Sequence, residues 1–262
     1  MARPFPLDPI PISYSGWQRY TKCPQQHFLV MTGQRPSIVD GRNFLNGNVL
    51  HKVLERWFTN EFGPEWIAEQ AAIVWDEYVD KKYILFKSPN DRAGLRAKCI
   101  LWGTALTKQV VELGIDKSRC QTELSIERFI SVDGYQVKLN GYIDVLAETS
   151  TGDHVVLDLK CSASRSVMNP YQMVFYSLLL QDEVRQRDSA FILPALDDIV
   201  PYTVSEEHRQ WLLGDIQQMA RDIVAGKFEP DTESGACFFC DVKALCPAMG
   251  GDIPVGRGRQ QL

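Results

Sequence analysis

The sequence predicts an α/β fold, with helices before and after a group of strands. Three observations predict it. Apolar residues recur at helical spacing between residues 46 and 62, strand-like runs follow one another from 121 to 159, and a further helix, two strands and a last helix complete the pattern. At 262 residues with 45% hydrophobic content, the chain is long enough to bury a full core. We expect one domain over residues 1–262.

The N-terminal half reads as helical after a proline-rich opening. A short helix is expected to end before Pro24, because proline disfavours helical backbone in the residue that precedes it. A second helix is predicted over 46–62, and it places His51 and Glu55 four residues apart on a common side. Two more helical stretches, 64–86 and 91–113, are separated by a turn-rich segment. We expect residues 61–113 to form a helical insertion.

The middle of the chain predicts three strands joined by short turns. Residues 121–130 and 136–148 flank Val132-Asp133-Gly134-Tyr135, a hairpin signal. A second turn, Ser150 to Asp153, leads into the apolar run Val155 to Leu159. These segments predict a three-stranded meander of antiparallel neighbours.

The remaining elements are expected to close the fold around this meander. A helix is predicted over 169–186, strands over 190–193 and 199–204, and a final helix over 205–225.

Composition limits the class of protein and its compartment. The formal net charge is −5 and the pI is near 5.5, which argues against a protein that holds nucleic acid by bulk positive charge. The sequence has no run of eighteen apolar residues, and its opening lacks the apolar region of a signal peptide. Seven cysteines, an odd number, suit metal or cluster binding in a reducing compartment better than a disulfide framework. We expect a soluble, cytoplasmic protein with no membrane association.

Two carboxylates and a lysine are predicted to converge on the meander. Asp158 and Lys160 are two apart on one strand and therefore share a face, and Asp144 can meet them from the neighbouring strand. Converging carboxylates repel each other, and a divalent cation such as Mg²⁺ or Mn²⁺ removes that cost. Such an ion can polarise a phosphoryl oxygen, with Lys160 stabilising negative charge, which predicts phosphodiester hydrolysis. From these residues alone, an ordinary charge group on a solvated strand face is the alternative.

The wider pattern resembles a known nuclease family. Gly141-Tyr-Ile-Asp144, Asp158-x-Lys160 and Gln172-Met-Val-Phe-Tyr176 are similar to the PD-(D/E)XK nuclease superfamily in its RecB-like form. The resemblance implies a restriction-endonuclease-like core, with a mixed central sheet flanked by helices. It also implies that Asp144, Asp158 and Lys160 are catalytic, with Gln172 and Tyr176 facing the substrate or assisting catalysis. The chain has Asp158 where glutamate is frequent in the superfamily.

The early helix extends the resemblance to a histidine. Gly47-Asn-Val-Leu-His51-Lys-Val-Leu-Glu55 fits a G-x-x-x-H-x-x-x-E pattern of RecB-like nucleases. The resemblance implies that His51 ligates the ion together with Asp144 and Asp158, and a nitrogen ligand favours Mn²⁺ over Mg²⁺. Taken alone, a histidine beside Leu50 and Leu54 is more often a half-buried residue with a satisfied ring. Glu123, on the strand predicted over residues 121–130, is a weaker candidate for a further carboxylate contact.

The cysteines predict a second site. Cys237-x₂-Cys240-x₅-Cys246 offers three thiolates, so a cluster or a zinc ion needs a fourth ligand from elsewhere. Cys23, in Tyr20-Thr-Lys-Cys23-Pro24, is the candidate. The combination is similar to the iron–sulfur staple of RecB-like exonucleases and of the CRISPR-associated Cas-four type. That resemblance implies a [4Fe–4S] cluster that joins the N- and C-terminal segments, residue 23 with residues 237–246, whereas spacing alone leaves zinc open.

Together these features predict a metal-dependent deoxyribonuclease. The resemblance implies an exonuclease acting on single-stranded or end-frayed DNA, in recombination, repair or CRISPR-type adaptation. Its expected partners are DNA ends and a recombination, helicase or CRISPR adaptation protein, since the sequence has no G-x-x-x-x-G-K-[ST] motor motif of its own. The alternative is a noncatalytic DNA-binding or scaffold protein that keeps the nuclease fold and a structural or redox cluster.

Overall fold

The computed structural model describes residues 8–33, 41–59, 62–82, 84–114, 116–148, 154–180, 186–233 and 235–251. These residues divide into two compact units. The terminal unit takes its described residues from Met1–Val39, Arg128–Asn140 and Leu213–Leu262, and the central unit takes them from Asp40–Glu127 and Gly141–Leu212. Each unit is therefore assembled from segments that are distant in the sequence.

The terminal unit holds both ends of the described chain. It contains β1 (Ile10–Ser13), α1 (Tyr14–Lys22), α2 (Pro24–Met31), most of α7 (Glu206–Ala225) and three short 3₁₀ helices, η4 (Ala236–Phe239), η5 (Lys243–Leu245) and η6 (Pro247–Met249). The Ser13 hydroxyl caps α1 by accepting the Gly16 N–H. The end of α1 before Pro24 is as predicted. Pro24 then occupies the first turn of α2, where its missing N–H costs nothing.

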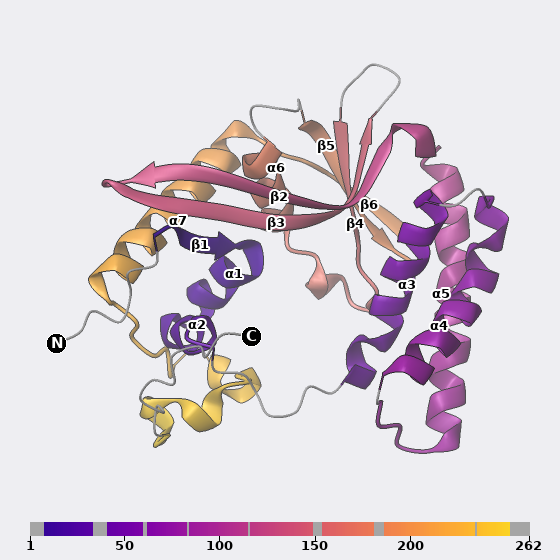
Figure 1. Cartoon of the computed structure of the whole chain (residues 1–262), viewed down its shortest axis with the longest axis horizontal. Coiled ribbons are helices and arrows are strands. Elements are labelled where there is room, and N and C mark those ends of the chain that lie inside the picture. Colours follow the sequence, from indigo (N-terminus) through magenta and orange to yellow (C-terminus); the bar gives the residue numbers. More distant parts are fainter. Residues whose placement is uncertain are drawn as a thin grey trace. The chain divides into compact units, whose positions relative to one another are not determined.

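Three long helices dominate the central unit. They are α3 (Gly41–Thr59), α4 (Ile67–Lys81) and α5 (Pro89–Glu112), with the 3₁₀ turn η1 (Pro64–Trp66) before α4. Figure 1 shows them side by side. The three helices predicted between 46 and 113 are present, but α4 ends at Lys81 and does not reach residue 86 as predicted; residues 60, 61 and 83 lie outside the described part of the chain. No described helix combines the length and apolar character that a membrane crossing needs.

The strands of the described residues form a six-stranded mixed sheet. Its members are β1, β2 (Cys120–Val132), β3 (Tyr135–Glu148), β4 (His154–Leu159), β5 (Gln186–Leu193) and β6 (Asp198–Thr203). They follow the order β1-β3-β4-β5-β6, and β2 pairs with β3. The β1–β3 and β4–β5 pairs are parallel, whereas β3–β4 and β5–β6 are antiparallel. The predicted α/β fold with a mixed central sheet and flanking helices is confirmed. Short 3₁₀ turns, η2 (Lys117–Arg119) and η3 (Arg165–Val167), precede β2 and α6.

The predicted meander is present. Asp133 and Gly134 link β2 to β3 with φ angles of 50° and 87°, the left-handed pair that a two-residue hairpin turn requires. β3 and β4 run antiparallel, with Val145 opposite Leu157. The second predicted turn, residues 150–153, lies outside the described residues.

Two local predictions were wrong. The helix expected over 169–186 is seen as α6 (Pro170–Leu180), and residues 181–185 lie outside the described residues. Gln186 begins β5 and does not end a helix, so β5 is longer than the predicted strand at 190–193. Pairing with β4 on one side and β6 on the other determines β5, and periodicity along one segment cannot reveal such partners. Strand β1 was not predicted, because its four residues contain Pro11. A proline is tolerated there since β1 ends the strand order.

The core of the central unit lies between the three helices and one face of the sheet. Buried side chains of α3, α4 and α5 pack with Val145, Leu157, Leu159 and Ile192. Successive strand residues point to opposite faces, so Asp158, between the two leucines, points away from this core. Helix α6 covers that other face, because Gln172 and Tyr176 on α6 hydrogen-bond the Asp158 carboxylate.

Gly141 permits the close approach of α6 to β3. A Cβ atom at residue 141 would lie 2.9 Å from Cδ1 of Leu179 and 3.7 Å from the Tyr176 ring. The first distance is shorter than a carbon–carbon contact allows. Glycine in the Gly-Tyr-Ile-Asp motif therefore sets how near α6, and the side chains it carries, can come to the strand.

A buried polar contact joins the three helices. The Asn46 side chain on α3 accepts a hydrogen bond from the Trp75 indole N–H on α4 at 3.0 Å and donates one to the Leu95 carbonyl on α5 at 2.9 Å. Trp75 is fully buried, and Asn46 is nearly so. Asn46 thus satisfies an indole donor that has no access to water.

We predict that Asn46→Ala lowers the free energy of unfolding by about 1–3 kcal/mol, because it leaves the Trp75 N–H buried without a partner. Urea unfolding followed by circular dichroism measures this change. Asn90→Ala, at an exposed position near the start of α5, is the control and should stay within about 0.5 kcal/mol of the parent protein. An equal effect of the two substitutions would contradict this role for Asn46.

Candidate active site

Strand β4 carries Asp158 and continues directly into Lys160. The Lys160 N–H donates to the Ile192 carbonyl of β5 at 2.8 Å, which prolongs the ladder by one residue and fixes the backbone beneath the ammonium group. Asp158 is only 1% exposed. The Lys160 ammonium lies 2.6 Å from Asp158 Oδ2. A lysine two residues from the buried aspartate therefore supplies the charge that burial of a carboxylate demands.

Helix α6 completes a hydrogen-bonded network around this pair. The Gln172 amide donates to Asp158 Oδ1 at 2.7 Å, and its carbonyl oxygen accepts from the Lys160 ammonium at 2.9 Å. The same amide contacts the Tyr176 hydroxyl at 2.7 Å, and that hydroxyl lies 3.4 Å from Asp158 Oδ1. Four of the residues singled out in the sequence are thus in direct contact. Gln172 and Tyr176 are four residues apart on α6 and therefore lie on one face of the helix.

Asp144 belongs to both the sheet and a second group of side chains. Its Oδ2 atom accepts the Leu159 backbone N–H at 2.7 Å, which fixes one oxygen of the carboxylate against β4. Its Oδ1 atom lies 3.4 Å from Nδ1 of His51 on α3. One oxygen of Asp144 is therefore committed to the backbone, whereas the other faces the histidine.

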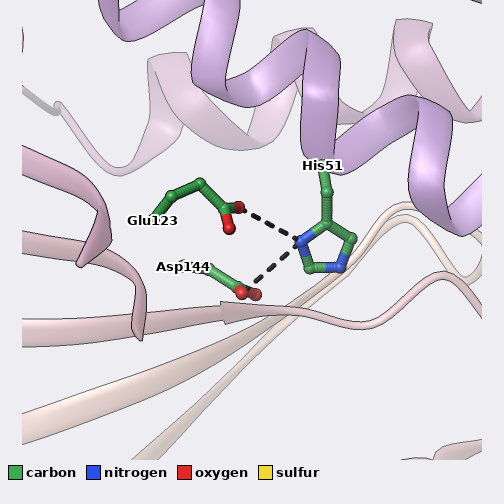
Figure 2. A group of neighbouring side chains, drawn as sticks. All are labelled: His51, Glu123 and Asp144. Atoms are coloured by element: carbon green, nitrogen blue, oxygen red, sulfur yellow. Dashed lines mark ion pairs between the residues drawn. The ribbon is translucent and has the colours of Figure 1, made fainter. Parts of the chain in front are cut away.

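His51, Glu123 and Asp144 form a group with the composition of a metal site. One ligand atom of each lies within 4.8 Å of those of the other two, and Figure 2 shows both carboxylates directed at the same imidazole nitrogen. The Glu123 carboxylate lies 3.9 Å from Nδ1 of His51. A nitrogen donor with two carboxylates suits a divalent transition ion. Asp158 stands outside this group and is held by its own network.

The backbone at Glu123 is strained. Its φ angle is 48°, within the left-handed region that costs a non-glycine residue about 1–2 kcal/mol. Residues of β2 alternate between partly buried and exposed, and Glu123 is at an exposed position. Its carboxylate is nevertheless directed towards His51. Local strain at an acidic residue in such a group is typical of functional sites.

The electrostatics of the two groups are coupled. Burial raises the pKa of Asp158, and repulsion from Asp144 raises it further, against the opposing effect of Lys160. Burial and Asp144 also raise the pKa of Glu123. Burial lowers the pKa of His51, but hydrogen bonding and charge attraction from Asp144, with the charges of Asp158 and Glu123, bring it above its ordinary value. Neighbouring carboxylates contribute to all three shifts, and a bound cation would neutralise that negative charge.

A pocket of about 600 Å³ opens beside His51, Glu123 and Asp144, referred to below as the metal-type group. His51 and Glu123 line it, together with side chains from α3 and α4. Among the latter are Lys52, Arg56, Tyr78, Lys81 and Lys82, none of which the sequence analysis singled out. Lys52 and Arg56 follow His51 at one-residue and five-residue spacing on the same helix, which is a signal the sequence did contain. Nothing local marks the α4 residues, because their relation to His51 depends on helix packing.

The four predicted cysteines lie in the terminal unit and line a single pocket. Cys23 stands between α1 and α2, Cys237 and Cys240 belong to η4 and its end, and Cys246 precedes η6. Asp231 lies among them: its N–H donates to the Cys23 sulfur at 3.4 Å, and its carbonyl accepts from the Cys237 thiol at 3.6 Å. All four cysteines are free thiols. Residues more than 200 positions apart thus contribute to one pocket lining.

Comparisons with known proteins identify the family. No curated protein is similar enough to the chain to count as a match. Among solved structures 27 chains are similar, and one, titled "Crystal structure of SSO0001", is 18% identical with a TM-score of 0.39, covering 78% of this chain and 96% of that chain. A family model of the PD-(D/E)XK nuclease superfamily matches residues 11–247, a span that includes every candidate site residue described above. The chain therefore belongs to the PD-(D/E)XK nuclease superfamily.

Proposed function

We propose that the protein is a metal-dependent DNA exonuclease, which hydrolyses phosphodiester bonds on single-stranded or end-frayed DNA during recombination, repair or CRISPR-type adaptation. The observation that carries the proposal is the contact network of Asp158, Lys160, Gln172 and Tyr176 beside the group of His51, Glu123 and Asp144. Nucleases of this superfamily use divalent metals, and both groups of residues fit metal-dependent hydrolysis of a phosphodiester bond.

The residues present fit a divalent cation. His51, Glu123 and Asp144 bring one ligand atom each within 4.8 Å of the others, and the pKa of Glu123 is raised by burial and by Asp144. This is an arrangement that an ion would stabilise. We propose Asp144 and His51 as ligands, as the sequence implies, and add Glu123. Asp158, predicted as a ligand, would contribute its charge from the adjoining network, and the imidazole nitrogen favours Mn²⁺ over Mg²⁺.

The protein side chains would divide the remaining work. A bound divalent ion would polarise a phosphoryl oxygen and acidify the attacking water. Lys160 is held by two acceptors, Asp158 and Gln172, so its ammonium group is aimed before substrate arrives and can stabilise negative charge on the phosphate. Gln172 and Tyr176 would hold Asp158 and Lys160 in this geometry, through the hydrogen bonds that link them.

The alternative is a noncatalytic DNA-binding or scaffold protein that keeps the nuclease fold. Burial of the Asp158 carboxylate costs free energy, which its contacts with Lys160, Gln172 and Tyr176 offset. A protein that only binds DNA does not need a buried carboxylate to orient a lysine. The presence of all six residues of the nuclease pattern therefore favours catalysis: His51, Asp144, Asp158, Lys160, Gln172 and Tyr176. A nuclease assay with and without EDTA separates the two functions.

We also propose that Cys23, Cys237, Cys240 and Cys246 hold a [4Fe–4S] cluster that staples the two ends of the chain. The cysteines line one pocket, and all four are free. Four cysteine thiolates are the ligand set of a [4Fe–4S] cluster.

We predict that Lys160→Ala reduces cleavage of linear single-stranded DNA by about 100- to 1,000-fold, because it removes a fixed cation from the phosphate. Release of end label in Mn²⁺ measures the rate, and circular single-stranded DNA of the same sequence tests for the need of an end. Lys108→Ala, an exposed lysine of α5, is the control. Full activity of Lys160→Ala with an unchanged circular dichroism spectrum would overturn the catalytic proposal, and rapid cutting of the circle would overturn the exonuclease assignment.

For the metal group, we predict that Glu123→Gln and His51→Ala each weaken Mn²⁺ binding by about tenfold or more, a loss typical of disturbed metal sites. Isothermal calorimetry without DNA measures the affinity, so the result does not depend on activity. Glu55→Gln is a matched control, since Glu55 lies four residues after His51 in the same pocket but outside the metal-type group. If the two site variants bind Mn²⁺ as tightly as the parent protein, these residues are not ligands.

For the cluster, we predict that anaerobically purified protein is brown, with broad absorbance near about 400 nm from thiolate-bound iron. Cys23→Ala and Cys246→Ala should each bleach the colour and lower the melting temperature, because the link between distant segments is broken. Cys120→Ala, a half-exposed thiol outside the pocket, should do neither. A colourless protein that contains stoichiometric zinc would refute the iron–sulfur assignment and leave the nuclease proposal standing.

A further inference from the structure

The pocket beside the metal-type group is lined by charged side chains of both signs. His51 and Glu123 are shared between the pocket and the metal-type group. Among the other lining residues, Lys52 pairs with Glu55 at 2.7 Å and Arg56 pairs with Glu77 at 2.6 Å. Within each pair the two charges cancel. These four residues therefore add little net charge to the pocket.

Two further lysines line the pocket at the end of α4. Lys81 is the last residue of α4 and Lys82 follows it, and both are exposed. In the described part of the chain, neither lysine forms an ion pair within 4.0 Å. The hydrogen bond of Arg56 lowers the pKa of Glu77, and the charge of Lys81 lowers it further, so Lys81 attracts this carboxylate without a close contact. The pocket lining thus combines His51 and Glu123 of the metal-type group with two exposed ammonium groups at the end of α4.

Tyr78 adds a hydrogen-bond donor to the same wall. Its hydroxyl oxygen accepts the Asn48 amide N–H at 3.1 Å, a contact that links α3 to α4. A phenol has one acceptor oxygen and one proton to donate. Because the oxygen is the acceptor in this contact, the hydroxyl proton can be donated to a ligand in the pocket.

We propose that this pocket binds the nucleic acid strand next to the scissile phosphate, with Lys81, Lys82 and Tyr78 contacting the neighbouring backbone phosphates. The inference rests on the proposed function, since it assumes that the scissile phosphate lies at His51, Glu123 and Asp144. A volume of about 600 Å³ falls within the range of pockets that enclose small organic groups, roughly 300–1,000 Å³. A protein with a net charge of −5 has to attract phosphates with a local group of cations, and Lys81 and Lys82 form such a group.

The test is the salt dependence of oligonucleotide binding. A labelled single-stranded oligonucleotide is titrated with full-length Asp158→Ala protein, which prevents cleavage, and fluorescence anisotropy gives the Kd at several salt concentrations. Adding Lys81→Gln and Lys82→Gln should reduce the slope of log Kd against log salt by about 0.7 for each phosphate that the protein no longer neutralises. If the variant and the parent bind equally at 1 M salt, the variant should bind about eightfold more weakly than the parent at 50 mM salt for each such phosphate. Lys108→Gln in the same background should leave both quantities unchanged.

Tyr78→Phe supplies an independent measurement. It keeps the ring and removes the hydroxyl, so binding should weaken with no change in the salt slope. In the cleavage-competent protein with Mn²⁺, the lysine variants should raise KM and leave kcat close to that of the parent. A structural role would instead lower kcat and thermal stability together.

The outcomes separate this inference from the proposed function. Unchanged slope and affinity in the lysine variants overturn the strand-binding site, whether or not the protein cleaves DNA. A lowered slope in a protein that never cleaves DNA supports the site and overturns only the nuclease activity. If a deoxynucleoside monophosphate displaces the oligonucleotide at concentrations near the oligonucleotide's own Kd, the pocket is a product site and the strand-binding proposal fails.

Discussion

A single buried carboxylate constrains the whole active-site region. Asp158 is nearly inaccessible to water, and an ionised group in that position requires both charge compensation and hydrogen bonds. Lys160 provides the first, and Gln172 provides the second while it also positions Lys160. The register of β4, the placement of α6 and the glycine at residue 141 all serve this requirement. If α6 lay farther from the sheet, Asp158 would lose its hydrogen-bond donors on that helix, and the Lys160 ammonium group would lose the acceptor that orients it.

Much of the fold could be predicted because its signals are local. The hairpin at Asp133-Gly134, the helical face of α3 and the Asp158-x-Lys160 pair are each set by residues within a few positions of one another. Strand β5 and strand β1 could not be predicted in the same way, since each depends on a partner strand from elsewhere in the chain. The local pattern accordingly predicts the end of a helix at Gln186, where β5 begins.

The candidate site divides along the same line. Gln172 and Tyr176 lie one helical turn apart, so a short motif was enough to pair them with Asp158. Glu123 was a weaker candidate because its direction depends on a left-handed backbone angle that no sequence pattern encodes. Lys81 and Lys82 were invisible, since an exposed lysine pair at the end of a helix is common and only the packing of α4 on α3 gives it a place beside His51.

The strained backbone at Glu123 distinguishes two kinds of selection on this protein. A residue with a positive φ angle is more stable as glycine or asparagine, which adopt that conformation at lower cost. A laboratory selection for heat resistance alone should therefore replace Glu123, whereas a selection that also requires metal-dependent function should retain it. The residue found at position 123 would then show which of the two selections a population of variants had passed through. The reason is that the side chain whose backbone conformation destabilises the fold is also the one that faces His51.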